Sequence, residues 1–210
     1  MIRVKVCGLN DPLNVKKLAE TKPDFMGFIF YPGSPRYVGD EPEMVLFRNV
    51  PPGIRRIGVF LNESNQKILD LSIRAGLEMI QLHGKESPVS CLQLKSSGLT
   101  IIKAFNIEAD FSFESLKQYM SVCDYFLFDT GSEKHGGSGI KFNWGKLEEY
   151  TLDKPFFLGG GIGSEDSGAI RSIRNSGLFA VDINSRFEIS PGIKDVEKVE
   201  TFIKAIKDEL

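Results

Sequence analysis

The sequence predicts a (β/α)8 barrel, the TIM-barrel form of the α/β class, compact and formed by a single domain over residues 1-210. Eight short runs rich in apolar and β-branched residues recur about every 20–30 residues. Segments with helical spacing of apolar residues separate most of these runs. Alternating strands and helices are typical of a parallel sheet, and eight repeats favour a closed barrel over an open sheet. Since such barrels typically have ~250 residues, this one would carry few insertions.

The predicted strands are nearly continuous in apolar residues, as expected of parallel strands covered on both faces. In such a barrel the βα loops at the C-terminal ends of the strands carry the chemistry, so polar residues directly after strands are the candidates. The eight predicted strands are Arg3–Cys7, Phe25–Phe30, Arg56–Leu61, Met79–Leu82, Ile101–Phe105, Tyr125–Asp129, Phe156–Gly159 and Phe179–Ile183.

Helices are predicted between the strands from capping residues and from the spacing of apolar side chains. Asp11 is a good N-cap with Pro12 at the first helical position, and Ser64 caps a segment with a helical apolar stripe. The predicted helices are Asp11–Thr21, Glu41–Phe47, Ser64–Ala75, Ser87–Lys95, Phe113–Met120, Trp144–Tyr150, Ser164–Asn175 and Asp195–Lys207.

Composition and charge narrow the classes of function. The formal net charge is −2, which argues against nucleic-acid binding, because such proteins usually show a basic face. No run of ~18 apolar residues exists, so no membrane span is predicted. Three cysteines without a CxxC spacing predict neither a disulfide framework nor a metal site, and they favour a reducing cytoplasm. The sequence leaves the choice between monomer and homodimer open.

A glycine-rich segment, Gly159 to Gly163, follows the seventh predicted strand. Glycines let backbone N–H groups approach an anion closely, and the following helix N-terminus favours negative charge. The eighth strand ends in Asp182, Asn184 and Ser185, and the loops after strands seven and eight frequently bind phosphate in this fold. A dinucleotide fingerprint is the competing interpretation, but Ser164 stands at its third glycine and the motif comes late. The segment therefore predicts a phosphate site.

Two further strand ends carry groups suited to proton transfer. Cys7 ends the first strand, where a thiol is by default a small buried hydrophobe. Asp129 ends the sixth strand after four apolar residues, where a carboxylate either caps the next turn or takes part in chemistry. Their positions at the C-terminal end of the barrel make both candidates for catalysis.

Other strand ends carry groups suited to binding. Arg36 follows the second strand and is either a clamp for a carboxylate or a solvated surface residue. Gln81 and His83 end the fourth strand and are supporting contacts in this interpretation. The glycine-rich stretch Gly136-Gly137-Ser138-Gly139 follows the sixth strand, and this position predicts a lid over a ligand.

Together these pieces resemble the phosphoribosylanthranilate isomerase family of tryptophan biosynthesis. The motifs occur in the family's order and run through almost the whole chain. They are Val4–Leu9, Gly27–Phe30, Ser34–Val38, Gly58–Phe60, Gln81–Gly84, Phe128–Asp129, Gly137–Gly139, Leu158–Ile162 and Asp182–Ser185.

The resemblance implies an Amadori rearrangement of N-(5-phosphoribosyl)anthranilate to 1-(2-carboxyphenylamino)-1-deoxyribulose 5-phosphate, with no metal or organic cofactor. It implies Cys7 as the general base and Asp129 as the general acid, in a pocket expected to shift their pKa values in opposite directions. Arg36 would hold the carboxylate of the substrate. The remaining contacts to the phosphorylated substrate would be Gln81, His83, Gly137, Ser138, Gly139, Gly160, Gly161, Asp182, Asn184 and Ser185.

Two positions depart from the commoner family pattern, namely Arg186, where glycine is frequent, and Asn143, where aspartate is frequent. Two other functions stay open. Another barrel enzyme of amino-acid biosynthesis would be expected to carry an aspartate in place of Cys7, or a lysine at a strand end, whereas Lys5 and Lys103 lie inside strands. A non-catalytic phosphate-binding barrel would need neither Cys7 nor Asp129.

Overall fold

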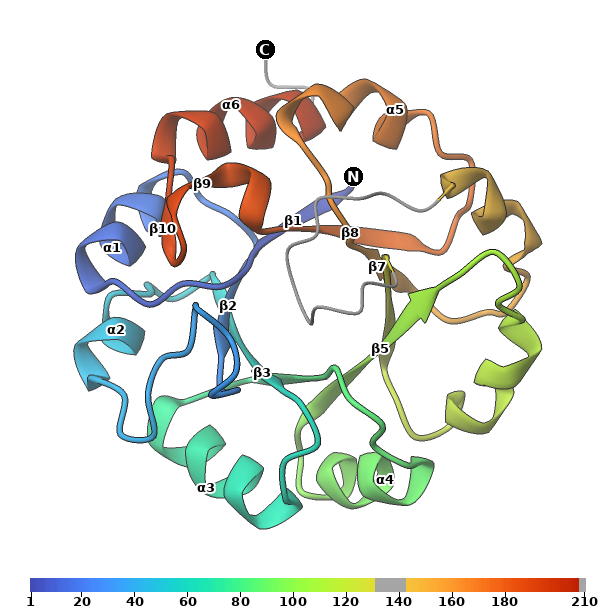
Figure 1. Cartoon of the computed structure of the whole chain (residues 1–210), viewed down its shortest axis with the longest axis horizontal. Coiled ribbons are helices and arrows are strands. Elements are labelled where there is room, and N and C mark those ends of the chain that lie inside the picture. Colours follow the sequence, from blue (N-terminus) through green and yellow to red (C-terminus); the bar gives the residue numbers. More distant parts are fainter. Residues whose placement is uncertain (131–142, 208–210) are drawn as a thin grey trace.

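The computed structural model describes residues 1–130 and 143–207. Eight parallel strands close into a barrel in sequence order, and the helices surround it (Figure 1). The barrel closes because β1 pairs with both β2 and β8. The predicted (β/α)8 fold is confirmed. In the described part of the chain, no helix is both long enough and apolar enough to cross a membrane.

All eight predicted strands are present, and each boundary lies within two residues of its predicted position. Only short, dense apolar runs were needed to place them, because these strands are buried on both faces. Their bounds are β1 Arg3–Val6, β2 Phe25–Ile29, β3 Arg55–Phe60, β4 Met79–Leu82, β5 Thr100–Ile107, β6 Tyr125–Thr130, β7 Phe156–Leu158 and β8 Leu178–Ile183.

The helices differ more from the prediction than the strands do. Five α-helices match predicted ones, although α2 begins three residues later than expected. Their bounds are α1 Pro12–Glu20, α2 Met44–Arg48, α3 Asn65–Ala75, α4 Pro88–Ser96 and α6 Val196–Lys207. The segments predicted as α-helices after β5 and before β7 are instead 3-10 helices, η1 Phe113–Tyr119 and η2 Trp144–Glu149. In η1 the buried residues Phe113 and Leu116 lie three apart, which fits three residues per turn.

The helix predicted over Ser164–Asn175 is shorter than expected. It is divided into η3, Ser164–Asp166, and α5, Ser167–Arg171. Asn175 lies outside the helix, and its side-chain amide donates to the carbonyl oxygens of Leu147 and Tyr150, at 2.8 and 3.1 Å. These contacts tie the chain to η2 before it enters β8.

A short hairpin after β8 was not predicted. It follows the 3-10 turn η4, Ser185–Phe187, and joins β9, Glu188–Ser190, to β10, Ile193–Lys194. Strands of three and two residues are too short to show alternation, and the turn depends on Gly192 with a φ of +90°. The hairpin places Glu188 and Lys194 beside the barrel.

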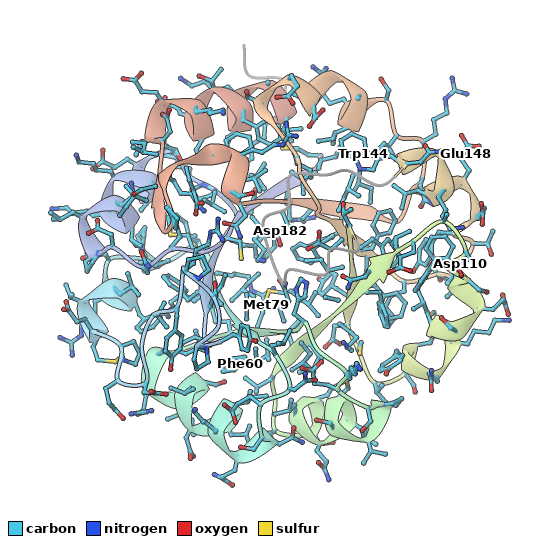
Figure 2. All side chains as sticks on the ribbon, viewed as in Figure 1. Phe60, Met79, Asp110, Trp144, Glu148 and Asp182 are labelled. Carbon is cyan, nitrogen blue, oxygen red and sulfur yellow. The ribbon has the colours of Figure 1, made fainter. Side chains whose placement is uncertain are left out.

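Apolar side chains fill the barrel interior near the N-terminal ends of the strands. The polar residues lie closer to the C-terminal ends. Strand residues two apart point to the same face, so Lys5 and Cys7 both point inward. Figure 2 shows Asp182 and Met79 near the centre of the barrel and Glu148 at its periphery. The interior cluster consists of Phe25, Ile57, Met79, Ile102, Ala104, Leu127, Phe157 and Ala180.

Candidate active site

A pocket opens at the C-terminal ends of the strands and gathers nearly all predicted site residues. These residues come from β4, β6 and β8 and from the segments that follow β1, β2, β4, β7 and β8. Lining it are Cys7, Arg36, Gln81, His83, Asp129, Gly160, Gly161, Asp182, Asn184 and Ser185. The predicted contacts at Gly137, Ser138 and Gly139 lie outside the described residues.

Cys7 directly follows β1, and only 4% of its surface is exposed. Its N–H donates to the carbonyl of Ile183 at 2.9 Å, so the backbone is fixed against β8. Gly27 on β2 leaves room for the thiol, since a Cβ there would lie 2.8 Å from Cys7 Sγ. Burial raises the pKa of Cys7, although the charge of Lys5 opposes this. The expectation that the pocket itself lowers this pKa was wrong, because burial outweighs the nearby ammonium groups.

Asp129 lies near the C-terminal end of β6, and 27% of its side chain is exposed. Its Oδ1 accepts the N–H of Thr130 at 2.7 Å, while Oδ2 lies 3.6 Å from His83 Nε2. Burial raises the pKa of Asp129 against the opposing effects of the Thr130 N–H and of Lys5. This direction favours a carboxyl group that keeps its proton, as a general acid requires.

Lys5 is a residue of the site that was predicted from the sequence only as part of a strand. Its side chain is completely buried, and Nζ donates to Asp182 Oδ2 and to Gln81 Oε1, both at 2.7 Å. Burial disfavours its charge, but Asp182 and Cys7 outweigh burial and raise the pKa of Lys5. A lysine two residues before Cys7 in an otherwise apolar strand is the signal that could have identified it, because both side chains face the interior.

The other oxygen of Asp182 is available to a ligand. Asp182 Oδ1 is buried and has no hydrogen-bond partner among the described residues. A buried acceptor without a partner is costly, so a ligand hydroxyl group at this point would be favourable. This supports the predicted role of Asp182 as a contact.

Arg36 reaches the pocket over Gly8, whose φ of +76° and missing Cβ make room for the arginine stem. Arg36 is predicted to clamp a carboxylate of a ligand, but part of its guanidinium group already binds a carboxylate of the protein. Its Nε and Nη2 donate to Glu188 at 2.8 and 2.6 Å. A guanidinium group has five N–H donors, so these two bonds to the hairpin leave three for a ligand. Sequence alone did not show this pair, because its members are 152 residues apart.

Glu188 also binds a second cation. Lys194 Nζ donates to Glu188 Oε1 at 2.6 Å and to Asn184 Oδ1 at 2.7 Å. Burial acts against the charge on Glu188, but Arg36 and Lys194 outweigh it and lower its pKa. Burial lowers the pKa of Lys194 to about 8. Two cations share one carboxylate here, which leaves this side of the pocket suited to an anion.

The glycine-rich loop offers a narrower anion site than the sequence predicted. Gly159 N–H donates to the carbonyl of Phe128 at 2.8 Å, and Gly163 N–H donates to Asp166 Oδ2 at 2.6 Å. Gly160 and Gly161 have φ angles of +84° and +64°. Their N–H groups donate to no atom of the described residues, so they are available to a phosphate.

Arg186 does not line this pocket and pairs instead with Glu165, with Nη1 3.2 Å from Oε1. Among the described residues, no group of three or more histidine, cysteine or acidic side chains could hold a metal ion. The pocket therefore offers proton-transfer groups and anion-binding groups.

Substitution of Gly160 by alanine is expected to weaken binding of inorganic phosphate at least tenfold, about 1.4 kcal/mol. The new Cβ would collide with Thr130, coming within 2.6 Å of its backbone nitrogen, and the positive φ is unfavourable for alanine. Titration calorimetry measures the affinity. Gly53→Ala is the matched control, since Gly53 also has a positive φ, +98°, but nothing lies within 4 Å. Equal affinities of the two variants would contradict this site.

Comparisons with known proteins cover the whole barrel. A sequence model of the family described as N-(5'phosphoribosyl)anthranilate (PRA) isomerase matches residues 4–205. The N-(5'-phosphoribosyl)anthranilate isomerase of Phocaeicola vulgatus is 42% identical over 207 residues, which cover 99% of this chain and 98% of that protein. A solved phosphoribosyl anthranilate isomerase in complex with reduced 1-(o-carboxyphenylamino)-1-deoxyribulose 5-phosphate is 31% identical, with a TM-score of 0.83 and coverage of 99% and 100%. A structure of monomers of the dimeric Thermotoga maritima enzyme is also 31% identical, with a TM-score of 0.83 and 99% coverage of both chains.

Proposed function

Since this chain belongs to the N-(5'-phosphoribosyl)anthranilate isomerase family, the enzymes of that step in tryptophan biosynthesis, we propose that Asp129 is its general acid and Cys7 its general base. The observation that carries this proposal is their meeting in one pocket with two anion-binding regions. The reaction is the Amadori rearrangement of N-(5-phosphoribosyl)anthranilate to 1-(2-carboxyphenylamino)-1-deoxyribulose 5-phosphate.

In the first step, Asp129 gives its proton to the ring oxygen of the ribose. The bond between this oxygen and C1 breaks, and the lone pair of the anthranilate nitrogen forms a C=N bond. The raised pKa of Asp129 supports this role, because an ordinary carboxyl group has a pKa of ~3.9 and would hold almost no proton at neutral pH. The product of this step is an open-chain, protonated Schiff base and an ionised Asp129.

In the second step, the thiolate of Cys7 removes the proton from C2 of the Schiff base. The electrons of the C–H bond form a C=C bond, and those of the C=N bond return to nitrogen. The resulting enolamine takes a proton at C1 and loses one from its C2 hydroxyl group, giving the ketone. C2 is oxidised from an alcohol to a ketone while C1 is reduced from an imine carbon to an amine carbon, so the reaction needs no redox partner.

Binding of the substrate uses the two ends of the pocket. The carboxylate of the anthranilate accepts hydrogen bonds from the free N–H groups of Arg36, and the phosphate lies against the loop at Gly160 and Gly161. Asn184 and Ser185 border the phosphate, and Asp182 Oδ1 accepts a ribose hydroxyl group. Further contacts are proposed at Gln81, His83, Gly137, Ser138 and Gly139.

A direct assay tests the proposed function. Freshly made phosphoribosylanthranilate is fluorescent, and its fluorescence is expected to fall when purified protein is added. The variant Cys7→Ser combined with Asp129→Asn is the control, because it keeps the pocket shape and lacks both proton-transfer groups. Loss of fluorescence at the uncatalysed rate with the wild-type protein would contradict the proposal.

The proposal extends to the setting of the enzyme. Residues 1-210 would act as one catalytic domain in the cytoplasm, consistent with the free thiols Cys7, Cys91 and Cys123, since a reducing compartment keeps thiols unpaired. Monomer and homodimer both fit the site, because every proposed contact comes from one chain. Light scattering in solution distinguishes them.

A further inference from the structure

A chain of hydrogen-bonding side chains leads from the buried Lys5 to the proposed general acid. Lys5 Nζ donates to Gln81 Oε1 at 2.7 Å. Gln81 Nε2 lies 2.8 Å from His83 Nδ1. His83 Nε2 in turn lies 3.6 Å from Asp129 Oδ2. Lys5 lies on β1, Gln81 on β4 and Asp129 on β6, while His83 directly follows β4, so this series of hydrogen bonds crosses the mouth of the barrel.

The direction of these hydrogen bonds is fixed at the lysine. An ammonium group can only donate, so the amide of Gln81 must turn its carbonyl oxygen towards Lys5. Lys5 cannot move away, because it is completely buried and also donates to Asp182 Oδ2 at 2.7 Å. The amide nitrogen of Gln81 therefore faces His83 and donates to Nδ1. The Nδ1 atom must accept.

The charge state of His83 follows from its surroundings. Burial, Lys5 and Lys103 lower its pKa to about 4, against the opposing charges of Asp182 and Glu86. The imidazole is therefore neutral at pH 7, with one protonated nitrogen. Since Nδ1 accepts from Gln81, the proton of the ring is on Nε2, and this N–H points at Asp129.

We propose that Lys5, acting through Gln81, holds His83 as the Nε2–H tautomer, so that the imidazole presents a donor to Asp129 and cannot take its proton. The inference rests on the proposed function, in which Asp129 is the general acid. Lys5 and Gln81 are then positioning residues, because they act through His83.

This arrangement serves both states of the acid. Asp129 Oδ1 accepts the N–H of Thr130 at 2.7 Å, so the acidic proton belongs on Oδ2. At 3.6 Å, His83 Nε2 leaves that proton free to point at the ligand. After the proton has been given away, the Nε2–H can approach Oδ2 and donate a charge-assisted hydrogen bond to the new carboxylate. The opposite tautomer would instead offer a lone pair that competes with the substrate for the proton.

Nitrogen NMR tests the tautomer directly in the intact protein. The chain has two histidines, His83 and His135, and the variant His135→Gln assigns the signals of His83. The nitrogen shifts and their couplings to the ring protons identify the protonated nitrogen. We expect a neutral ring protonated on Nε2 at pH 7. A proton on Nδ1, or a cationic ring, would overturn the inference.

An isosteric change at Gln81 is expected to reverse the direction of the hydrogen bond between residue 81 and His83. In Gln81→Glu the carboxylate accepts from Lys5 and needs a second donor, so the proton of His83 is expected to move to Nδ1. The matched control Gln81→Met removes both hydrogen bonds without imposing the opposite direction. We expect kcat of Gln81→Glu to be at least about tenfold below that of Gln81→Met, the effect of a misplaced hydrogen bond to a charged group. Equal kcat values would overturn the inference.

Variants of His83 separate a donor from a merely structural side chain. His83→Gln keeps an N–H group near the position of Nε2, whereas His83→Met keeps only bulk. We expect glutamine to restore most of the kcat that methionine loses, while both variants share a similar KM. The NMR result does not depend on turnover. A protein with the wrong tautomer but full activity refutes only the inference, whereas an active Asp129→Asn variant refutes the proposed function.

Discussion

Asp129→Asn is expected to lower kcat by at least ~100-fold, the lower end of what general acid–base catalysis contributes. The side-chain oxygen of asparagine can still accept the Thr130 N–H that Asp129 Oδ1 accepts at 2.7 Å. The shape of the pocket is therefore kept. The amide has no acidic proton to give to the ring oxygen, so ring opening loses its catalyst. Steady-state kinetics with saturating substrate measures the loss.

Asp124→Asn is the matched control for this variant. Asp124 Oδ2 also accepts a backbone N–H, that of Ile101 at 2.8 Å, but it lies before β6, outside the pocket. Its replacement also removes an ion pair with Lys95 and is expected to change stability and not kcat. Near wild-type turnover of Asp129→Asn would exclude Asp129 as the acid.

Asp129→Asn is also expected to change the stability of the protein. Since burial raises the pKa of Asp129 in the folded protein, the folded state binds its proton more tightly than the unfolded state. The protein therefore loses stability as pH rises from the ordinary aspartate pKa, ~3.9, through the raised pKa. Asparagine does not ionise, so the variant should have the higher Tm at pH 7, and the difference should shrink towards pH 3. Such an exchange of stability for activity is expected at a catalytic residue.

How far the sequence predicts this molecule depends on the range of the interactions. The strands are set by local runs of apolar residues, so β4 was placed correctly at both ends. The pair of Lys5 and Asp182 joins residues 177 positions apart, and only barrel closure brings them together. Local sequence contains no signal for such a pair.

The two catalytic candidates show the same contrast between local and long-range interactions. The positions of Cys7 and Asp129 were predictable because both end strands, and strand ends meet at one face of a barrel. The direction of the Cys7 shift was not, since it depends on how deeply the thiol is buried and on how closely Lys5 approaches. Both pKa values are raised before substrate binds.

The raised pKa values of Cys7 and Asp129 determine the expected pH dependence of kcat/KM. The reference values are ~8.5 for cysteine and ~3.9 for aspartate, so we expect Cys7 to titrate above Asp129. The productive form, with ionised Cys7 and protonated Asp129, is then a minor species at every pH. The profile is still bell-shaped, but its low-pH limb ends at the pKa of Asp129 and its high-pH limb begins at that of Cys7. Substrate binding that lowers the pKa of Cys7 would narrow the bell in kcat.

Cys7→Ser is expected to lower kcat/KM by at least ~100-fold and to change the shape of this profile. Serine keeps the size of the side chain beside Gly27, but its hydroxyl group does not ionise in the working range. Without a thiolate, the remaining activity should be flat at low pH and fall as Asp129 ionises. In Asp129→Asn the profile should instead rise until Cys7 is fully ionised.

The opposite changes in the two profiles are the decisive measurement. A variant that merely distorts the pocket lowers the whole curve but keeps both of its limbs. Cys91→Ser places a hydroxyl group at another fully buried thiol, outside the pocket, and should leave the profile unchanged. If Cys7→Ser keeps both limbs at their wild-type positions, another group is the base. Lys194 is then the first to test, because burial lowers its pKa to about 8 and its charge acts on Cys7.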